Sequence, residues 1–379
     1  MKEISLYIHI PFCKQKCFYC DFPSFAGKEK YREDYIEALC KEILDKCQQY
    51  KIKSIFIGGG TPSYLEVHEI KKLLETVNKL QFADNMEFTM ECNPGTVNEE
   101  KLIAMKDGGI NRISFGLQSC NNELLKVIGR IHTYEEFVEN YKLARKLGFN
   151  NINVDLMYGL PNLTVDFWKD NLAKICSLKP EHISAYSLII EEGTAFYTLH
   201  MKDKLNLPSE EEEREMDKLT KDVLGSGGYH QYEISNYSLE GRECEHNKVY
   251  WKLKEYIGVG SSSSSYIDGF RIVNDSNVKN YIEKMQNNES VEVDRYKNTI
   301  KDEMEEYMFM GLRLNEGVSK MEFKQKFNTN IDSIYGNVIE KNIKRGLLQM
   351  KDDKLSLTVK GISLANEAMS DFILEKYIE

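Results

Sequence analysis

The chain has 379 residues, 41% of them hydrophobic, and a formal net charge of −10. This length allows two or three domains, and the hydrophobic content is typical of a globular protein with a sizeable core. The negative charge argues against a protein that coats nucleic acid or an anionic membrane, so we expect no nucleic-acid partner.

The N-terminus and the cysteines indicate the compartment. Residues 1–11 have neither the long apolar core nor the small-residue cleavage site of a signal peptide. No apolar run approaches the roughly 18 residues of a membrane span, so we expect a cytoplasmic protein without an integral membrane segment. The nine cysteines are an odd number in a chain without an export signal, which argues against a disulfide framework.

The first two-thirds of the chain alternates short β-branched or aromatic runs with helical patterns. The expected strands are Ser5–Ile10, Ser54–Ile57, Glu87–Glu91, Arg112–Leu117, Ile152–Met157 and Ile183–Ile190. The expected helices are Tyr31–Gln49, Val67–Leu80, Glu99–Lys106, Tyr134–Leu147 and Val165–Leu178. This alternation predicts βαβ units and a parallel sheet. Six such units predict an α/β fold with an incomplete (β/α)6 barrel that stays open on one side.

Unusual residues follow each expected strand. They are the cysteine cluster, Gly58–Pro62, Glu91–Pro94, Gly116–Ser119, Asp155 near the end of the fifth strand, and Glu191–Gly193. All six groups therefore lie at carboxyl ends of strands, the rim at which βα barrels carry their chemistry.

The pattern changes beyond residue 200. An acidic helix over Ser209–Leu224 begins at a serine cap. Short strands and turns are expected at Gln231–Ile234, His246–Trp251, Tyr256–Val259 and Phe270–Val273, with a tight loop over Ser261–Ser265. From about Ile300, helices and a hairpin around Asp352–Asp353 resemble a small winged-helix domain. We therefore expect a barrel domain over 1–200, an α+β extension over 201–299 and a winged-helix-like domain over 300–379.

Cys13, Cys17 and Cys20 form the spacing C-x3-C-x2-C. Thiolates are good ligands for iron–sulfur clusters, and three of them leave one iron of a four-iron cluster open for a small molecule. The alternatives are zinc, which usually needs a fourth ligand, or three free thiols.

The stretch from His9 to Phe22 resembles the opening of the radical S-adenosylmethionine (SAM) superfamily in its coproporphyrinogen-oxidase-like branch. The resemblance implies a [4Fe–4S] cluster on the three cysteines and SAM on the open iron, from which a 5′-deoxyadenosyl radical is released. It implies that Tyr19 lies beside adenine and that Tyr7 lies near the cluster. The remaining SAM contacts that it implies are Gly59, Gly60 and Thr61 at the methionyl end, Glu91 at the hydroxyl or amino groups, Gln118 and Asp155 at the ribose, and Arg130 at the carboxylate. Taken singly, Glu91 also suits a helix cap, and Arg130 suits a surface charge.

Two related families compete within this branch. One is oxygen-independent coproporphyrinogen III oxidase, and the other is the radical SAM haem chaperone family HemW. The oxidase has a further cysteine at the position of Phe22 and an N-terminal extension that this sequence lacks. The run His246–Trp251 resembles the H-N-x-x-Y-W signature of the chaperones, which favours the chaperone family.

The chaperone resemblance implies a haem contact at His246, because histidine is a common axial ligand of haem iron. A lone histidine beside buried aromatics also suits a core hydrogen bond. The sequence departs from the family at Ser264, where a histidine is usual. The implied partners are haem, an apo-haemoprotein client, and a reductase or flavodoxin-type electron donor. The alternative function is the oxidase.

Overall fold

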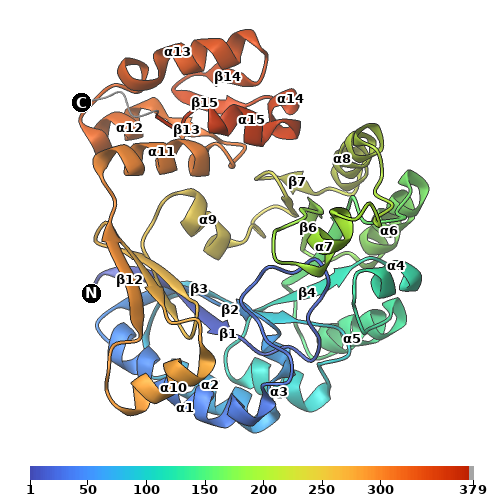
Figure 1. Ribbon diagram of the computed structural model, residues 1–379, viewed down its shortest axis with the longest axis vertical. Helices are drawn as coiled ribbons and strands as arrows, with labels where there is room; N and C mark the ends of the chain where they lie inside the picture. Colours follow the sequence, from blue (N-terminus) through green and yellow to red (C-terminus); the bar gives the residue numbers. More distant parts are fainter. Residues whose placement is uncertain (375–379) are drawn as a thin grey trace.

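The computed structural model describes residues 1–374 and is built around six parallel strands. These are β1 (Glu3–Ile10), β2 (Lys51–Gly59), β3 (Gln81–Cys92), β4 (Arg112–Gln118), β5 (Ile152–Tyr158) and β6 (His182–Ser187), each paired with the next in chain order. The connecting helices are α1 (Arg32–Cys47), α2 (Val67–Val77), α3 (Glu99–Asp107), α4 (Asn122–Val127), α5 (Tyr134–Lys146) and α6 (Val165–Leu178). The predicted strand–helix alternation is confirmed (Figure 1).

Local sequence explains why these elements form where they do. Thr133 caps α5 through a reciprocal capping box with Glu136, and Thr164 accepts a hydrogen bond from the backbone N–H of Phe167 at the start of α6. All seven residues of β4 are buried, as expected for a central strand covered on both faces. The helices bury an apolar stripe against the outside of the sheet.

The sheet continues beyond the barrel strands on both sides. β9 (Tyr256–Val259) pairs with β1 in parallel, followed by antiparallel β10 (Ser264–Ile267), β11 (Phe270–Asn274) and β12 (Glu292–Lys297). On the other side, β8 (Asn236–Ser238) and β7 (His230–Gln231) follow β6. The twelve strands run in one linear order from β12 to β7, so the barrel is open, as predicted. The serine run is only partly a loop, since Ser264 and Ser265 begin β10.

Helix α9 (Glu245–Trp251) corrects one prediction, because His246–Trp251 was expected as a short strand or turn. The Glu87 carboxylate, from β3, accepts the backbone N–H groups of Glu245 and His246, both at 3.0 Å. This cap comes from a strand that is remote in sequence, so no local pattern could indicate it. In Figure 1, α9 lies between the barrel and the C-terminal elements.

Three further helices lie after the barrel strands and in the extension: α7 (Ala195–His200), α8 (Glu210–Ser226) and α10 (Val278–Gln286). The acidic helix was predicted with its cap, and Ser209 forms a reciprocal capping box with Glu212 at the start of α8. The helices α4, α7 and α10 were not predicted. In the part of the chain that the structure describes, no helix is long and apolar enough to cross a membrane.

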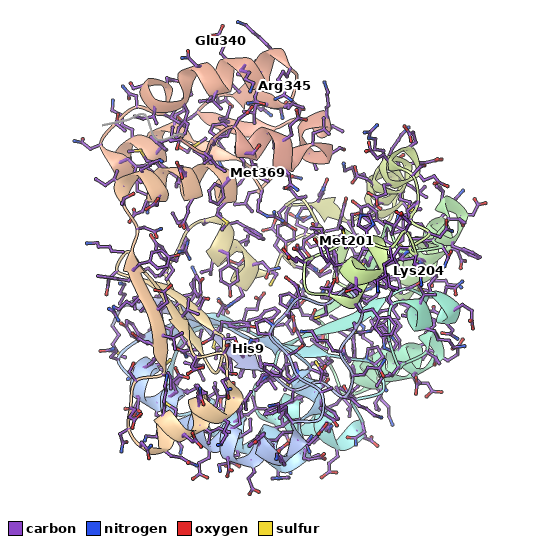
Figure 2. All side chains as sticks on the ribbon, viewed as in Figure 1. His9, Met201, Lys204, Glu340, Arg345 and Met369 are labelled. Carbon is purple, nitrogen blue, oxygen red and sulfur yellow. The ribbon has the colours of Figure 1, made fainter. Side chains whose placement is uncertain are left out.

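The C-terminal elements form a lobe with a core of its own (Figure 2). It contains α11 (Ile300–Gly311), β13 (Val318–Ser319), α12 (Lys320–Phe327), α13 (Ile331–Lys344), β14 (Leu348–Lys351), β15 (Lys354–Leu357), α14 (Val359–Ser363) and α15 (Ala365–Ser370). The predicted hairpin is β14–β15, and β13 completes a three-stranded antiparallel sheet. Phe323, Tyr335, Leu355 and Phe372 are buried in this core. The proposed domain boundaries at 200 and 299 stay a prediction.

Candidate functional site

One cavity of about 690 Å³ gathers every residue that the sequence analysis singled out as a ligand. It extends from the carboxyl ends of the barrel strands to α9. Its lining includes Tyr7, Cys13, Cys17, Tyr19, Cys20, Gly59, Gly60, Thr61, Glu91, Gln118, Arg130, Asp155 and His246. Residues that lie up to 239 positions apart in the chain therefore face a common space.

The three cysteines of the motif lie on the loop after β1. Cys13 is buried, while Cys17 and Cys20 are half-buried, and all nine cysteines of the chain are free. The Thr61 hydroxyl donates to Cys13 Sγ and the Arg130 guanidinium to Cys17 Sγ, both at 3.5 Å. Burial raises the pKa of Cys20 to about 11, so such donors are needed to stabilise negatively charged sulfurs here.

This donor set fits a cluster better than one ion. Within residues 1–374, no group of three or more His, Cys, Asp or Glu side chains is arranged to hold a single metal ion. In an iron–sulfur cluster each thiolate binds its own iron, so the sulfurs stand further apart than around one zinc ion. Three free thiols on one loop face one cavity, where they could each bind an iron of such a cluster.

The glycine loop after β2 packs directly against the cysteine loop. A Cβ at Gly60 would lie 2.8 Å from the carbonyl oxygen of Phe12 and 3.0 Å from Cys13 Sγ. Gly59 has φ = +108°, and a Cβ there would lie 2.5 Å from the ring of His9. Only glycine allows the two loops to approach so closely and leaves the backbone open to the cavity.

Two carboxylates lie on the cavity wall. Glu91 accepts the backbone N–H of Gly59 at 3.2 Å, and burial, followed by the nearby Asp155, raises the pKa of Glu91 to about 8. Asp155 accepts from Asn153 at 2.7 Å and from Ser114 at 3.4 Å, and burial raises its pKa too. Such a pair suits the hydroxyl and ammonium groups of a polar ligand. Glu91 caps no helix.

Arg130 and Gln118 are held in the cavity lining by hydrogen bonds to their neighbours. Arg130 donates to Asn93 at 2.8 Å and contacts the carbonyl oxygen of Gly116, so it is part of the cavity and not a solvated surface charge. Gln118 has a left-handed backbone (φ = +71°), and its side chain accepts from the Tyr186 hydroxyl at 2.9 Å. A non-glycine residue in this conformation is uncommon and marks a position that the surrounding structure fixes.

Tyr7 and Tyr19 contribute aromatic walls. The Tyr7 hydroxyl lies 3.0 Å from His9 Nδ1, and its ring stacks on Phe56 with centroids 6.5 Å apart. Tyr19 lies beside Cys17 and Cys20, where burial raises its pKa above the ordinary value. Both rings therefore stay neutral hydrogen-bonding and stacking groups at physiological pH.

His246 is buried at the α9 end of the cavity, with a relative exposure of 1%. Its Nδ1 lies 2.9 Å from Ser54 Oγ and its Nε2 lies 2.9 Å from the Tyr250 hydroxyl. Burial lowers the pKa of His246 to about 3, so the ring is neutral at pH 7. Iron coordination by His246 would therefore require one of these hydrogen bonds to open.

The remaining signature residues divide between two places. Asn247 and Tyr250 line the cavity, whereas Trp251 lies under the guanidinium of Arg313, 4.3 Å from the ring centroid. Ser264, which replaces the usual histidine, is exposed on β10 and does not line the cavity. The absent histidine therefore leaves the cavity wall unchanged.

Sequence reasoning gave no role to several residues of the lining, among them Arg112, Asn93 and Tyr186. Arg112 could have been found, because a charged residue at the start of a largely apolar strand needs a reason to be there. Asn93 follows the Glu91–Cys92 pair and binds both Arg130 and Thr61. Tyr186 gave no signal beyond its place in β6.

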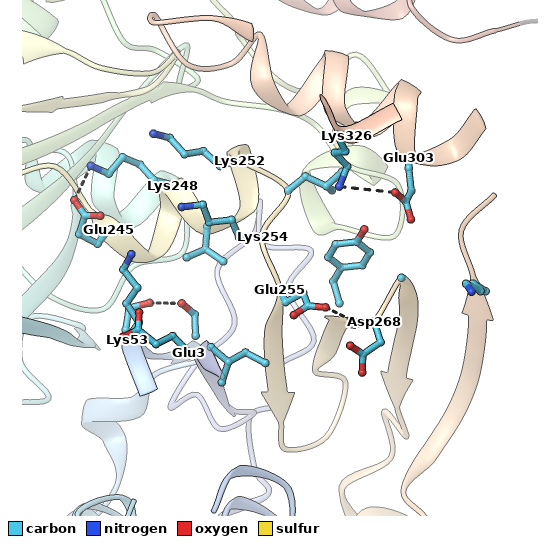
Figure 3. A pocket seen from close by; sticks show the side chains of 18 residues that line it. Glu3, Lys53, Glu245, Lys248, Lys252, Lys254, Glu255, Asp268, Glu303 and Lys326 are labelled. Atoms are coloured by element: carbon cyan, nitrogen blue, oxygen red, sulfur yellow. Dashed lines mark hydrogen bonds and ion pairs between the residues drawn. The ribbon is translucent and has the colours of Figure 1, made fainter. Parts of the chain in front are cut away.

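A second cavity of about 680 Å³ lies on the other side of α9, facing α11 and α12 (Figure 3). Six lysines and five acidic residues line it. Several of the lysines are paired: Lys248 with Glu245 at 2.6 Å, Lys326 with Glu303 at 3.8 Å, and Lys252 with Glu316 at 2.7 Å. Ser54 lines this second cavity, and its hydroxyl lies 2.9 Å from His246, which lines the first. Helix α9 and the start of β2 thus separate the barrel cavity from a solvated, charged space beside the C-terminal lobe.

The fold and the cysteine-lined cavity define a radical SAM protein. The family model described as the radical SAM superfamily matches residues 7–173, and the HemN C-terminal domain matches residues 298–364. The solved structure of coproporphyrinogen III oxidase (HemN) from Escherichia coli covers 100% of this chain with a TM-score of 0.86, at 22% identity and over 91% of its own length. At that identity the likeness concerns the fold.

Comparison with curated relatives shows to which family within the radical SAM superfamily the chain belongs. The chain is 39% identical to the haem chaperone HemW of Bacillus subtilis, over 98% of this chain and 99% of the relative. It is 34% identical to the haem chaperone HemW of Escherichia coli, over 99% of both chains. The chain belongs to the haem chaperone HemW family. The predicted family and fold class are therefore confirmed, whereas the roles of the individual site residues stay predictions.

Proposed function

We propose that this protein is a radical SAM haem carrier, which binds a [4Fe–4S] cluster, SAM and haem and delivers haem to apo-haemoproteins. The observation that carries the proposal is the full-length relationship to haem chaperones, at 39% identity over 98% of this chain. The barrel cavity adds support, because it combines three cysteine thiols with polar and aromatic walls.

The residues after β1 hold the cluster in this proposal. Cys13, Cys17 and Cys20 bind it, while Thr61 and Arg130 donate to the sulfurs of Cys13 and Cys17. Gly59, Gly60, Thr61, Glu91, Gln118, Arg130 and Asp155 bind SAM, with Tyr19 beside the adenine and Tyr7 near the cluster. When bound, the cluster supplies one-electron reduction of SAM. The chain's own contribution is to position SAM and to exclude water from the barrel.

His246 contacts haem in this proposal. The ring is neutral, which suits an iron ligand, and Tyr250 and Phe56 add flat surfaces beside it. The Nε2 atom would have to exchange its bond to the Tyr250 hydroxyl for the haem. Both residues of that bond lie on α9, so its opening is a rearrangement within this helix.

The partners follow from the same proposal. They are haem, an apo-haemoprotein client, and a reductase or flavodoxin-type donor that reduces the cluster. We place the protein in the cytoplasm and divide it at residues 200 and 299 into barrel, extension and C-terminal domain. A separate apolar core in the C-terminal lobe, around Phe323 and Tyr335, supports the second boundary.

A second candidate is oxygen-independent coproporphyrinogen III oxidase, which one observation favours: the fold likeness to that enzyme covers the whole chain. Phe22 argues against it. The side chain is 62% exposed at the edge of the cavity, where the sequence pattern of the oxidases has a cysteine. A phenylalanine can neither bind the cluster nor donate a proton or electron.

Parallel assays on anaerobically reconstituted protein separate the two functions. Haem is titrated by absorbance, and coproporphyrinogen III consumption is followed with SAM and a reductant present. We expect stoichiometric haem binding and no decarboxylation. Decarboxylation without stable haem binding would show that the oxidase is the correct function.

A further inference from the structure

Arg112 is the least explained charge in the barrel cavity. It is the first residue of β4 and has a relative exposure of 2%, yet it lines the cavity. In the described part of the chain, no carboxylate lies within 4.0 Å of its guanidinium, and its Nε has no hydrogen-bond partner. A buried charge without direct partners is strongly unfavourable, so a structure that keeps one has a ligand or a counter-charge to offer it.

The nearest carboxylates already accept hydrogen bonds from other donors. Glu87 accepts the backbone N–H groups of Glu245 and His246 and the thiol of Cys244. Asp155 accepts from Asn153 and Ser114. They act on Arg112 only through space, so its planar set of N–H donors is left to face the cavity.

Based on these contacts, we propose that Arg112 binds a carboxylate of the ligand that enters the barrel, and that this carboxylate is a propionate of haem. The proposal rests on the haem-carrier function. Guanidinium and carboxylate form two parallel hydrogen bonds, a geometry that arginine supplies better than any other side chain. Haem carries two such groups, so a buried arginine would select it against esterified or uncharged tetrapyrroles.

Position favours haem over the carboxylate of SAM. Arg130, the predicted partner of the SAM carboxylate, contacts Gly116, four residues beyond Arg112 on the same strand. At about 3.3 Å per residue, Arg112 and Gly116 are roughly 13 Å apart along β4. Arg112 pairs in register with Thr89 of β3, two residues beyond Glu87, which accepts the backbone N–H of His246, the predicted haem contact, at 3.0 Å. In this proposal, Arg130 binds the SAM carboxylate toward one end of the cavity and Arg112 binds a haem propionate toward the other.

A purely structural role is the competing explanation, in which Arg112 only balances Glu87 and Asp155. The two explanations differ in one respect. A counter-charge affects folding, but it does not distinguish a ligand from the esterified form of the same ligand. The test therefore compares haem with haem dimethyl ester, which removes the negative charges and leaves the ring and the iron unchanged.

Both ligands are titrated in the same detergent by absorbance against the wild type, Arg112→Lys and Arg112→Gln, and SAM binding is measured alongside by calorimetry. Arg145→Gln is the matched control, because Arg145 pairs with Glu181 at 2.8 Å outside the cavity. We expect the wild type and Arg145→Gln to bind haem about 10- to 100-fold more tightly than the ester, as for a charge-assisted hydrogen bond. Arg112→Gln should bind both forms alike, and Arg112→Lys should fall between.

Equal wild-type affinity for haem and its ester would overturn the inference and leave the carrier function standing, and so would discrimination that survives in Arg112→Gln. A loss of SAM binding alone in Arg112→Gln would also overturn it, in favour of the SAM carboxylate. If the wild type binds neither tetrapyrrole, the proposed function fails and this inference with it. Because Arg112→Gln can fail to fold, Arg112→Lys keeps the charge and supplies the second variant, and equal wild-type affinity for the two ligands overturns the inference without any variant.

Discussion

The ring of His246 on α9 lies 2.9 Å from the hydroxyl of Ser54 on β2, and this buried contact joins the H-N-x-x-Y-W helix to the interior of the barrel. Ser54 in turn donates to Ser5 at 2.8 Å, so the helix is tied to two neighbouring strands. The signature helix is therefore part of the barrel wall.

Replacing His246 with alanine should destabilise the protein, because it opens a cavity and leaves Ser54 and Tyr250 without their partner. We expect a loss of about 2–4 kcal/mol in the free energy of unfolding. Urea denaturation measures it, with His200→Ala on the exposed face of α7 as a control that should change little. Haem affinity measured on the folded variant tests the proposed contact, and an undiminished affinity would contradict it.

Substituting Gly60 with alanine should disrupt the cysteine loop. The added Cβ would meet two backbone carbonyls, of Ile10 at 2.9 Å and of Phe12 at 2.8 Å, and neither can move without shifting β1. We expect a destabilisation of about 1–3 kcal/mol and a lower iron content after reconstitution. Gly225→Ala is the matched control, since nothing lies within 4 Å of its Cβ position in α8, and it should be neutral or slightly stabilising. Equal effects of the two substitutions would contradict the close packing of the loops.

Glu91 should make the stability of the ligand-free protein depend on pH. Its pKa is about 8 in the folded chain, raised by burial from its ordinary 4.5. The native state therefore holds this proton more tightly than the unfolded state, and stability that is full below about pH 4.5 is lost as the pH rises through 8. Glu91→Gln removes the titrating group, so its stability should fall less than that of the wild type between pH 6 and 8.5. Urea midpoints at the two pH values measure this, and parallel losses would show that Glu91 is not the group responsible.

Single replacements of Cys13, Cys17 or Cys20 by alanine should abolish the cluster. Iron and acid-labile sulfide should fall from about four of each per chain to near zero, because three thiolates are the minimum set that holds a four-iron cluster here. Cys176→Ala offers a control on α6, outside the cavity. A variant at one of the three positions that keeps its full iron content would exclude that cysteine as a ligand.

The barrel and its rim were predictable because both depend on short-range signals. Each predicted barrel strand falls within an observed strand or overlaps most of it, and most of the rim residues lie at or just after a strand's carboxyl end, as Gly59 ends β2 and Glu91 and Cys92 end β3. In a parallel sheet, neighbouring carboxyl ends meet at one edge, so sequence order alone brings these residues together. The predicted residues consequently share one cavity.

The α9 region and the role of Arg112 were not predictable for the opposite reason, although a charge at the start of a largely apolar strand was itself a signal. The helix is capped by Glu87, which is 159 positions from His246, and a remote cap leaves no local pattern. The significance of Arg112 depends on what Glu87 and Asp155 already bind, which only the folded chain defines. Within α9, Tyr250 lines the cavity, whereas Trp251 packs under Arg313 and away from the cavity, because a helix turns its successive residues to different sides.

Transfer of haem is the measurement that tests the account most directly. Haem-loaded protein, reconstituted with its cluster and supplied with SAM, is mixed with an apo-haemoprotein, and the client's holo spectrum is followed over time. The account predicts that the client gains haem in proportion to the haem that the carrier loses, faster than from free haem in the presence of a competing haem scavenger. Haem that stays on the protein, or that reaches the client only by way of solution, would contradict it.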